Sequence, residues 1–196
     1  MALTKLNNQA VANITTLPVA LGDMVLVSSA TASSSASIEF SLGNYKEYKF
    51  FFVNIHPSTS GANLSFQCST DSGSTYATTM TTTFFRAAHD EADTTAVLGY
   101  DSGFDLAQST SFQPIMTNMG IDNDMCGSGS LQLFNPSSNT FVKHFVAETN
   151  IYQTSVFNNT QFIAGYANTT SALTNIKFQM SSGNIDAGTI LMYGVN

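Results

Sequence analysis

The stretch KEYKFFFVNIH, residues 46–56, decides the class of fold that this sequence predicts. Successive side chains of a β-strand point to opposite faces of its sheet. One face of this stretch would carry Tyr48, Phe50 and Phe52, and the other Lys49, Phe51, Val53 and Ile55. Both faces are largely apolar after Lys49, so we expect a central strand that is buried on both sides.

Other segments of the chain repeat the strand pattern. ANLSFQC, residues 62–68, alternates the apolar Leu64, Phe66 and Cys68 with the polar Ser65 and Gln67. Segments rich in β-branched and aromatic residues predict further strands at 37–40, 129–135, 141–148, 161–167, 175–180 and 189–195. No long segment has the 3.6-residue period of a helix.

Gly, Pro, Ser and Asn clusters separate these strands. We expect turns at 56–63, 70–75, 127–130, 135–139, 158–160 and 181–188. Thr83 to Asp105, rich in acids and alanines, is expected to form a long loop, with one helical turn as the alternative. Short strands between such turns predict an all-β protein, an antiparallel β-sandwich of the jelly-roll kind, over residues 21–196.

Residues 1–20 differ from the rest of the chain. MALTKLNNQAVANITTLP lacks regular alternation and ends at Pro18. We expect an extended N-terminal arm that binds a neighbouring chain or sheet edge, the alternative being a disordered terminus. The residues expected to bind the partner are Leu3, Leu6, Val11, Ile14 and Leu17.

Composition and charge exclude several classes of function. Only 10% of residues are charged, against roughly 25% in an ordinary soluble domain. The net charge is −7, with six Lys and Arg against thirteen Asp and Glu, too few cations to bind nucleic acid or a membrane surface. The sequence has neither an apolar run of about 18 residues nor a recognisable signal peptide, so we expect synthesis in a cytoplasm.

The sequence contains two cysteines, which could be free thiols or form a disulfide. Cys68 lies on an alternating segment beside Leu64 and Phe66, which favours a free buried thiol. A disulfide between Cys68 and Cys126 is the other possibility.

The segment STDSGSTY, Ser69 to Tyr76, fits the Asp-box pattern of sialidases and other sugar-handling β-proteins. In that pattern Asp71 accepts backbone N–H groups, Gly73 takes a positive φ and Tyr76 packs beneath the turn. Sialidase chemistry also needs several arginines, and Arg86 is the only arginine of the chain. The motif therefore predicts a hairpin rather than a glycosidase.

No other motif predicts catalysis or a cofactor. The three histidines, His56, His89 and His144, are too dispersed to predict a ligand set, and His144 is expected to be a satisfied or exposed strand residue. Seven of the thirteen acids lie between Asp90 and Asp124, where a solvated acidic loop is favoured over a structural cation site. The sequence contains no nucleophile elbow, P-loop or dinucleotide fingerprint. We expect no enzyme, no metal and no cofactor.

Several long segments resemble small β-rich virion surface proteins of tailed, especially marine, bacteriophages. They are MALTKLNNQ (1–9), FVNIHPSTSGANLSFQCSTDSGSTY (52–76), LFNPSSNTFVKHF (133–145) and FIAGYANTTSALTNIKFQMSSGNIDAGTILMYGV (162–195). The resemblance implies a sandwich fold and a structural role on a virion, as capsid or tail surface component or fibre domain, and carries over no active-site residue. Leu191 stands where the family suggests Lys, which would indicate a more buried terminus.

Two functions are expected from these observations. The first is a virion structural protein, a capsid decoration or cement protein ahead of a tail or fibre component, assembled in the host cytoplasm as a homotrimer that binds other virion proteins. The alternative is a carbohydrate-binding module that recognises the host surface. Its expected glycan contacts are Tyr100, Asp101, Phe104 and Asp105.

Overall fold

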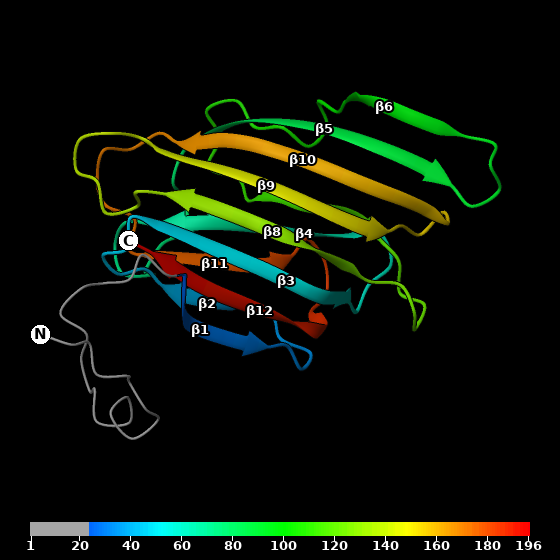
Figure 1. Ribbon diagram of the computed structural model, residues 1–196, viewed down its shortest axis with the longest axis horizontal. Helices are drawn as coiled ribbons and strands as arrows, with labels where there is room; N and C mark the ends of the chain where they lie inside the picture. Colours follow the sequence, from blue (N-terminus) through cyan, green and yellow to red (C-terminus); the bar gives the residue numbers. More distant parts are fainter. Residues whose placement is uncertain (1–23) are drawn as a thin grey trace, which may run out of the picture.

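The computed structural model describes residues 24–196, which form two antiparallel β-sheets packed face to face (Figure 1). The β-sandwich predicted from the sequence is confirmed. Among these residues, no helix is long and apolar enough to cross a membrane.

One sheet, here called the large sheet, has eight strands in the order β1-β12-β3-β8-β9-β10-β5-β6. Its strands are β1 (Val25–Thr31), β12 (Ile185–Val195), β3 (Glu47–Pro57), β8 (Gly127–Phe134), β9 (Lys143–Tyr152), β10 (Phe157–Ala167), β5 (Met80–Asp90) and β6 (Ala96–Tyr100). The other, the small sheet, has four strands in the order β2-β11-β4-β7. They are β2 (Ile38–Ser41), β11 (Asn175–Met180), β4 (Ala62–Ser69) and β7 (Gln113–Met119).

The strand order is that of a jelly roll with an extended sheet. The chain passes from one sheet to the other at eight connections: β1 to β2, β2 to β3, β3 to β4, β4 to β5, β6 to β7, β7 to β8, β10 to β11 and β11 to β12. Four strands of the large sheet, β1-β12-β3-β8, match the four of the small sheet, as in two nested Greek keys. The remaining strands, β9, β10, β5 and β6, continue the large sheet beyond β8, so its outer face is wide (Figure 1).

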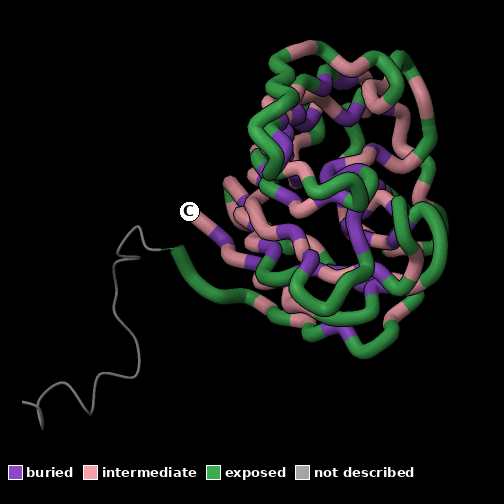
Figure 2. Tube along the Cα trace, turned by 90° about the vertical axis from the view of Figure 1, so that its right-hand side faces the viewer, coloured by how far each residue is buried: buried purple, intermediate pink, exposed green. Residues whose placement is uncertain are grey.

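Phenylalanine rings fill the space between the sheets. Phe178 of β11 lies 5.4 Å from Phe50 and 5.3 Å from Phe52 of β3, between ring centroids. Phe66 of β4 packs edge-on against Phe145 of β9 at 4.9 Å. Figure 2 shows buried residues recurring along the strands, while the connecting loops are mostly exposed. The apolar faces predicted from alternation therefore form the core.

The prediction that β3 is buried on both sides is wrong. Its outer face is open to solvent: Phe51 is half-buried and Val53 is 43% exposed. Asn54 has a φ of +51° at a shift of register between β3 and β8. This irregularity interrupts the alternation, so Ile55 turns inward and is fully buried instead of sharing the face of Phe51.

The long loop predicted for Thr83 to Asp105 is also wrong. β5 continues to Asp90 and pairs with β6 in a hairpin, with Phe84 buried and Phe85 facing out. Asp90 closes the hairpin, because its carboxylate accepts hydrogen bonds from the backbone N–H groups of Thr94 and Thr95. Three of the acidic residues that suggested a loop, Asp90, Glu91 and Asp93, lie at this turn, and the other two, Asp101 and Asp105, follow β6.

Two shorter turn predictions fail for a related reason. Residues 127–130 begin β8, and residues 158–160 lie inside β10. Both strands are paired on both sides, so the cross-strand hydrogen bonds override the weak strand preference of Gly, Ser and Asn.

Candidate functional site

The outer face of the large sheet carries a row of aligned side chains, one from each of seven neighbouring strands. Pairing of the strands places these residues in one line across the sheet, on the same side: Leu191, Phe51, Ser130, Glu148, Phe162, Phe85 and Tyr100. We call this line the aromatic row. Rings stand toward both ends, and a serine and a carboxylate lie between them.

The rings of the row contact each other and their neighbours. Phe85 and Phe162 are stacked, with centroids 4.9 Å apart and planes 13° apart. At the other side of the row, Phe51 packs edge-on against Tyr193 at 5.6 Å. Phe85 nevertheless remains 43% exposed. Ser130 and Glu148 separate these two groups of rings, so the row presents two apolar patches with a polar centre.

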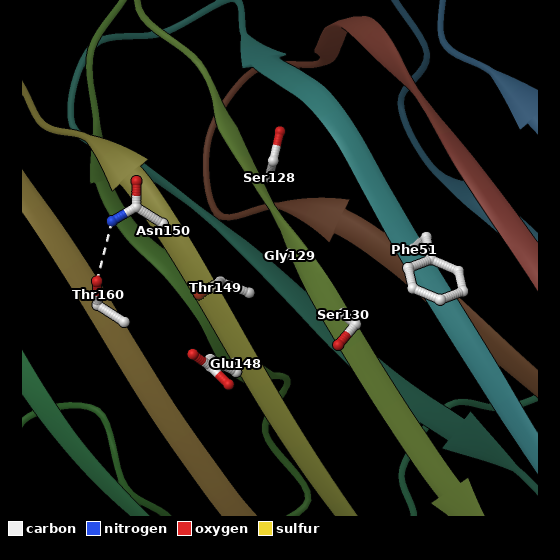
Figure 3. Close-up of a pocket in the computed structure, with 8 residues that line it drawn as sticks. All are labelled: Phe51, Ser128, Gly129, Ser130, Glu148, Thr149, Asn150 and Thr160. Carbon is white, nitrogen blue, oxygen red and sulfur yellow. Dashed lines mark hydrogen bonds between the residues drawn. The ribbon is translucent and has the colours of Figure 1, made fainter.

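A hollow of about 550 Å³ lies between Phe51 and Thr160, across β3, β8, β9 and β10 (Figure 3). Ser128 and Ser130 of β8 line it with small side chains. A second hollow of about 360 Å³ adjoins the first and is lined by Phe85, Phe162, Val146, Gln132 and Lys49, among others. Ser130 and Glu148 line both, so the two hollows form one groove along the row.

One side chain in the lining of the groove can only accept hydrogen bonds, the carboxylate of Glu148. The Glu148 side chain is exposed and has no hydrogen bond or ion pair with any other residue of the described part of the chain. By contrast, Asn150 donates from Nδ2 to Asn158 Oδ1 at 2.6 Å and to Thr160 Oγ1 at 2.9 Å. The Glu148 carboxylate is therefore available to a donor from outside the chain.

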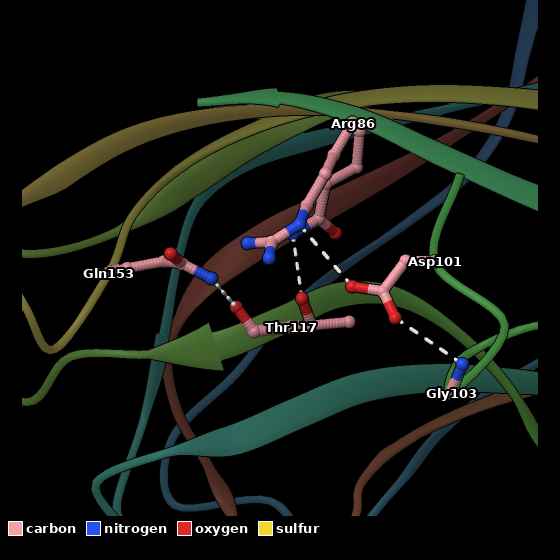
Figure 4. A network of polar contacts seen from close by, with 6 residues as sticks. Arg86, Asp101, Gly103, Thr117 and Gln153 are labelled. Atoms are coloured by element: carbon pink, nitrogen blue, oxygen red, sulfur yellow. Dashed lines mark hydrogen bonds and ion pairs between the residues drawn. The ribbon is translucent and has the colours of Figure 1, made fainter. Parts of the chain in front are cut away.

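The charges in the groove are few. Glu148 is the charged residue of the first hollow, and Lys49 joins it in the second. Arg86 follows Phe85 in β5, so its side chain lies on the opposite side of the sheet, where its Nε is 3.3 Å from Asp101 Oδ2 (Figure 4). The groove thus contains no arginine.

Gln161, the cross-strand neighbour of Arg86, belongs to an interior polar network beneath the extended part of the large sheet. Its Nε2 donates to Thr117 Oγ1 at 2.8 Å. Gln153 Nε2 donates to the Thr117 carbonyl at 3.1 Å (Figure 4). No histidine joins Arg86 there. The network connects β10 to β7 across the sandwich.

The four residues predicted to contact a glycan do not form one open site. The Tyr100 hydroxyl donates to the Asp105 carboxylate, which raises the pKa of Tyr100, and Asp101 pairs with Arg86. Phe104 packs against buried Phe84 at 5.3 Å. Of the four, Tyr100 alone lies on the outer face, at the end of the aromatic row.

The segment 69–76 has the turn chemistry expected of it but does not form a hairpin. Asp71 Oδ1 accepts from Ser69 Oγ at 2.6 Å and from the backbone N–H of Thr75 at 2.9 Å, and Gly73 has a φ of +83°. These hydrogen bonds lower the pKa of Asp71 to about 2.

The strands that this turn joins lie in different sheets. β4 pairs with β11 and β7, whereas β5 pairs with β10 and β6, so the predicted hairpin is wrong. Tyr76 packs outside the small sheet, donating to Glu39 Oε2 at 2.8 Å beneath Lys177 Nζ. The turn is a crossover between the sheets.

The cysteines and histidines form no evident catalytic group. Both cysteines are free, so a disulfide is excluded, and burial raises the pKa of the Cys68 thiol to about 12. His56 Nδ1 lies 3.8 Å from Asp186 Oδ2 in a shallow pocket that Cys126 also lines, but the Cys126 thiol faces Asn54 Oδ1 at 3.8 Å.

The remaining predicted residues have the following positions. His144 is exposed, with its ring 5.8 Å from that of Tyr166, as expected of a strand residue. Leu191 is half-buried in the aromatic row. Within residues 24–196, no group of three or more His, Cys, Asp or Glu residues is placed to hold a metal ion. The arm residues lie outside the described residues: Leu3, Leu6, Val11, Ile14 and Leu17.

The aromatic row was not predicted from the sequence. The alternation of β3 places Phe51 on the face opposite Phe50, but both faces were expected to be buried. The register that aligns Phe51 with Glu148 and Phe162 depends on pairing between strands far apart in the chain. Comparison with known proteins adds no relative, since no family model, curated protein or solved structure matches the chain.

Proposed function

We propose that this chain is a structural subunit of the surface of a tailed-bacteriophage virion, most simply a capsid decoration or cement protein, and otherwise a tail or fibre component. In this proposal it is assembled in the host cytoplasm as a homotrimer, and its partners are other virion proteins. The role is adhesive and not catalytic. The observation that carries the proposal is the character of the two edges of the large sheet.

Both edge strands are apolar and uncharged. β1 reads VLVSSAT, and its Val25, Leu26 and Val27 are each at least 40% exposed. β6 reads AVLGY, and its Leu98 is 80% exposed. Neither strand has a second pairing partner among the described residues. An edge strand without charge or proline is a template for pairing with another chain, which monomeric proteins usually avoid.

The two edges favour assembly between copies. β1 and β6 lie at opposite ends of the same sheet, so pairing of β1 in one copy with β6 in the next is a head-to-tail contact. Head-to-tail contacts close into a ring when the rotation between subunits fits. The predicted arm supplies a segment of suitable chemistry to add to such an edge, since its apolar residues lie among polar ones of which Lys5 alone is charged. Low charge also limits repulsion between crowded copies.

The size of the recombinant protein in solution tests the assembly step. We expect a trimer by light scattering coupled to gel filtration, and dissociation when Leu98→Lys places a charge on β6. Ile121→Lys provides the control, because Ile121 is 44% exposed in a loop outside both edges. A monomer for the unsubstituted chain contradicts the assembly step.

The virion step is tested on particles. Purified particles of the phage that encodes the chain should contain it, in many copies for a shell protein and in few for a tail component. Particles that lack it should lose stability or infectivity. If particles without the protein are equally stable and equally infectious, the proposed function is wrong.

A further inference from the structure

We propose that the groove along the aromatic row binds a neutral oligosaccharide. This inference goes beyond the virion role and does not depend on it, since it rests on the groove alone. It also differs from the glycan contacts predicted from the sequence, all four of which interact with other residues of the chain.

The rings provide the surface on which sugar rings stack. The face of an aromatic ring carries partial negative charge, and it attracts the weakly positive C–H groups on the apolar face of a pyranose. Phe51 stands at one end of the first hollow, and the stacked Phe162 and Phe85 stand in the second. Three strand spacings separate Phe51 from Phe162, roughly 14 Å. That length favours a chain of sugars over a monosaccharide.

The floor provides acceptors for sugar hydroxyls. The Glu148 carboxylate, without a partner in the described part of the chain, lies in the line between Phe51 and Phe162. Ser130 Oγ lies beside it in the same row. A carboxylate accepts several hydrogen bonds and donates none, so it fits a ligand rich in O–H donors.

The charges of the groove select a neutral ligand. Glu148 is the charge at the junction of the two hollows, and it would repel the carboxylate of an acidic sugar. The single arginine of the chain, the usual bidentate partner of a carboxylate, lies on the other side of the sheet. Lys49 is the one cationic residue that lines the second hollow, where it is balanced by Glu148, and its Nζ lies 5.5 Å from the Phe51 ring centroid.

A protein partner fits this groove less well. The centre of a protein–protein interface is depleted in charged residues, because an unpaired buried charge costs free energy. Here the unpaired carboxylate of Glu148 lies at the centre and the apolar rings lie on both sides of it. An oligosaccharide fits both the carboxylate and the rings, because its hydroxyls reach Glu148 while its ring faces cover Phe51 and Phe162.

The test is binding of defined oligosaccharides to the full chain. The probes are neutral linear hexasaccharides (maltohexaose, cellohexaose and mannohexaose) and, for comparison, acidic ones (oligoalginate and oligogalacturonate), measured by calorimetry. We expect at least one neutral probe to bind and the acidic probes to bind at least about tenfold more weakly. Phe162→Ala and Glu148→Gln should each weaken binding of the neutral probe about tenfold.

Two matched variants control for general effects. Phe141→Ala removes an exposed ring outside the groove, and Asp122→Asn neutralises an exposed carboxylate in the loop after β7, so both should bind as the unsubstituted chain does. Glu148→Gln keeps the size of an exposed side chain, so it remains informative if Phe162→Ala does not fold. Absence of binding by every neutral probe overturns the proposal, and so does stronger binding of the acidic probes. Binding that neither groove variant weakens also overturns it. None of these results bears on the presence of the protein in virions.

Discussion

The rings of Phe85 and Phe162 lie stacked, 4.9 Å apart, on the outer face of the large sheet, although 77 positions of sequence separate them. They face each other because β5 and β10 pair in the register that sets Phe85 opposite Phe162. Cross-strand aromatic pairs of this kind stabilise a sheet as well as presenting a surface.

This pair should contribute a measurable coupling to stability. In a double-mutant cycle with Phe85→Leu and Phe162→Leu, we expect a coupling free energy of about 0.5–1.5 kcal/mol. Urea denaturation of the four proteins measures it. Phe85→Leu combined with Phe51→Leu is the control, because these rings do not contact each other, and additive effects are expected there. A coupling near zero for the first pair would mean that the stacked geometry does not contribute to the fold.

Asp71 should make stability depend on pH in the acid range. Its pKa is lowered to about 2 in the folded protein, first through the hydrogen bond from Ser69 and then through those from Thr75, against about 3.9 for an unfolded chain. Its contribution is therefore present above about pH 4 and is lost as the pH falls from about 4 to about 2.

The check compares the unsubstituted chain with Asp71→Asn by urea denaturation between pH 2 and pH 6. The difference in unfolding free energy between the two proteins should shrink as the pH falls through that window. Asp122→Asn, on an exposed loop residue, should give a difference that does not follow the same course. A difference for Asp71→Asn that is constant with pH would contradict the assignment.

Lys143 should make stability depend on pH in the alkaline range. The residue is fully buried, and its Nζ donates to the carbonyls of Thr169 at 3.0 Å and Ser171 at 2.6 Å. Burial lowers the pKa of this amine below its ordinary value. The unfolded state therefore binds more protons than the folded state between the lowered pKa and about pH 10.4, and stability rises with pH across that window.

Lys143→Met removes this titration. The unfolding free energy of the unsubstituted chain should rise relative to that of Lys143→Met as the pH approaches 10.4. Lys177→Met is a matched control, since Lys177 is partly exposed, ion-paired with Glu39 at 2.8 Å, and belongs to the small sheet. A relative fall in the stability of the unsubstituted chain over this window would show that the pKa of Lys143 is raised rather than lowered.

Asn159 should be a site where a less polar residue stabilises the fold. Its side chain is fully buried in β10, and both Oδ1 and Nδ2 lack a hydrogen-bond partner. A buried polar group without a partner costs about 1–3 kcal/mol, and leucine has nearly the same shape without that cost. We expect Asn159→Leu to raise the unfolding free energy by about 1 kcal/mol.

Chemical denaturation measures this change. Asn158→Leu is the control, because Asn158 is the adjacent residue on the exposed face of the same strand, and it should give no gain. Destabilisation by Asn159→Leu would indicate that a buried water molecule satisfies the amide, which a high-resolution crystal structure would then show.

Local pattern in the sequence was sufficient for much of the core and for eight of the twelve strands, while β1, β5, β6 and β7 were not predicted. Tyr48, Phe50 and Phe52 were expected on one face, and all three are buried. Asp71, Gly73 and Thr75 likewise make their turn from short-range hydrogen bonds and one positive φ, which depend on neighbouring residues alone. Where the local pattern was mixed, as in Thr83 to Asp105, the prediction was wrong because pairing with β10 decided the structure.

The sequence by itself determined that this chain would form alternating strands around a core of phenylalanine, since the two-residue period of a strand is a local property. The tertiary structure alone decided which strands became neighbours, and therefore that Phe51, Glu148 and Phe162 would share one row. The physical reason is that register is fixed by hydrogen bonds between backbones far apart in the chain, and a shift of one residue would turn each of those side chains to the other face.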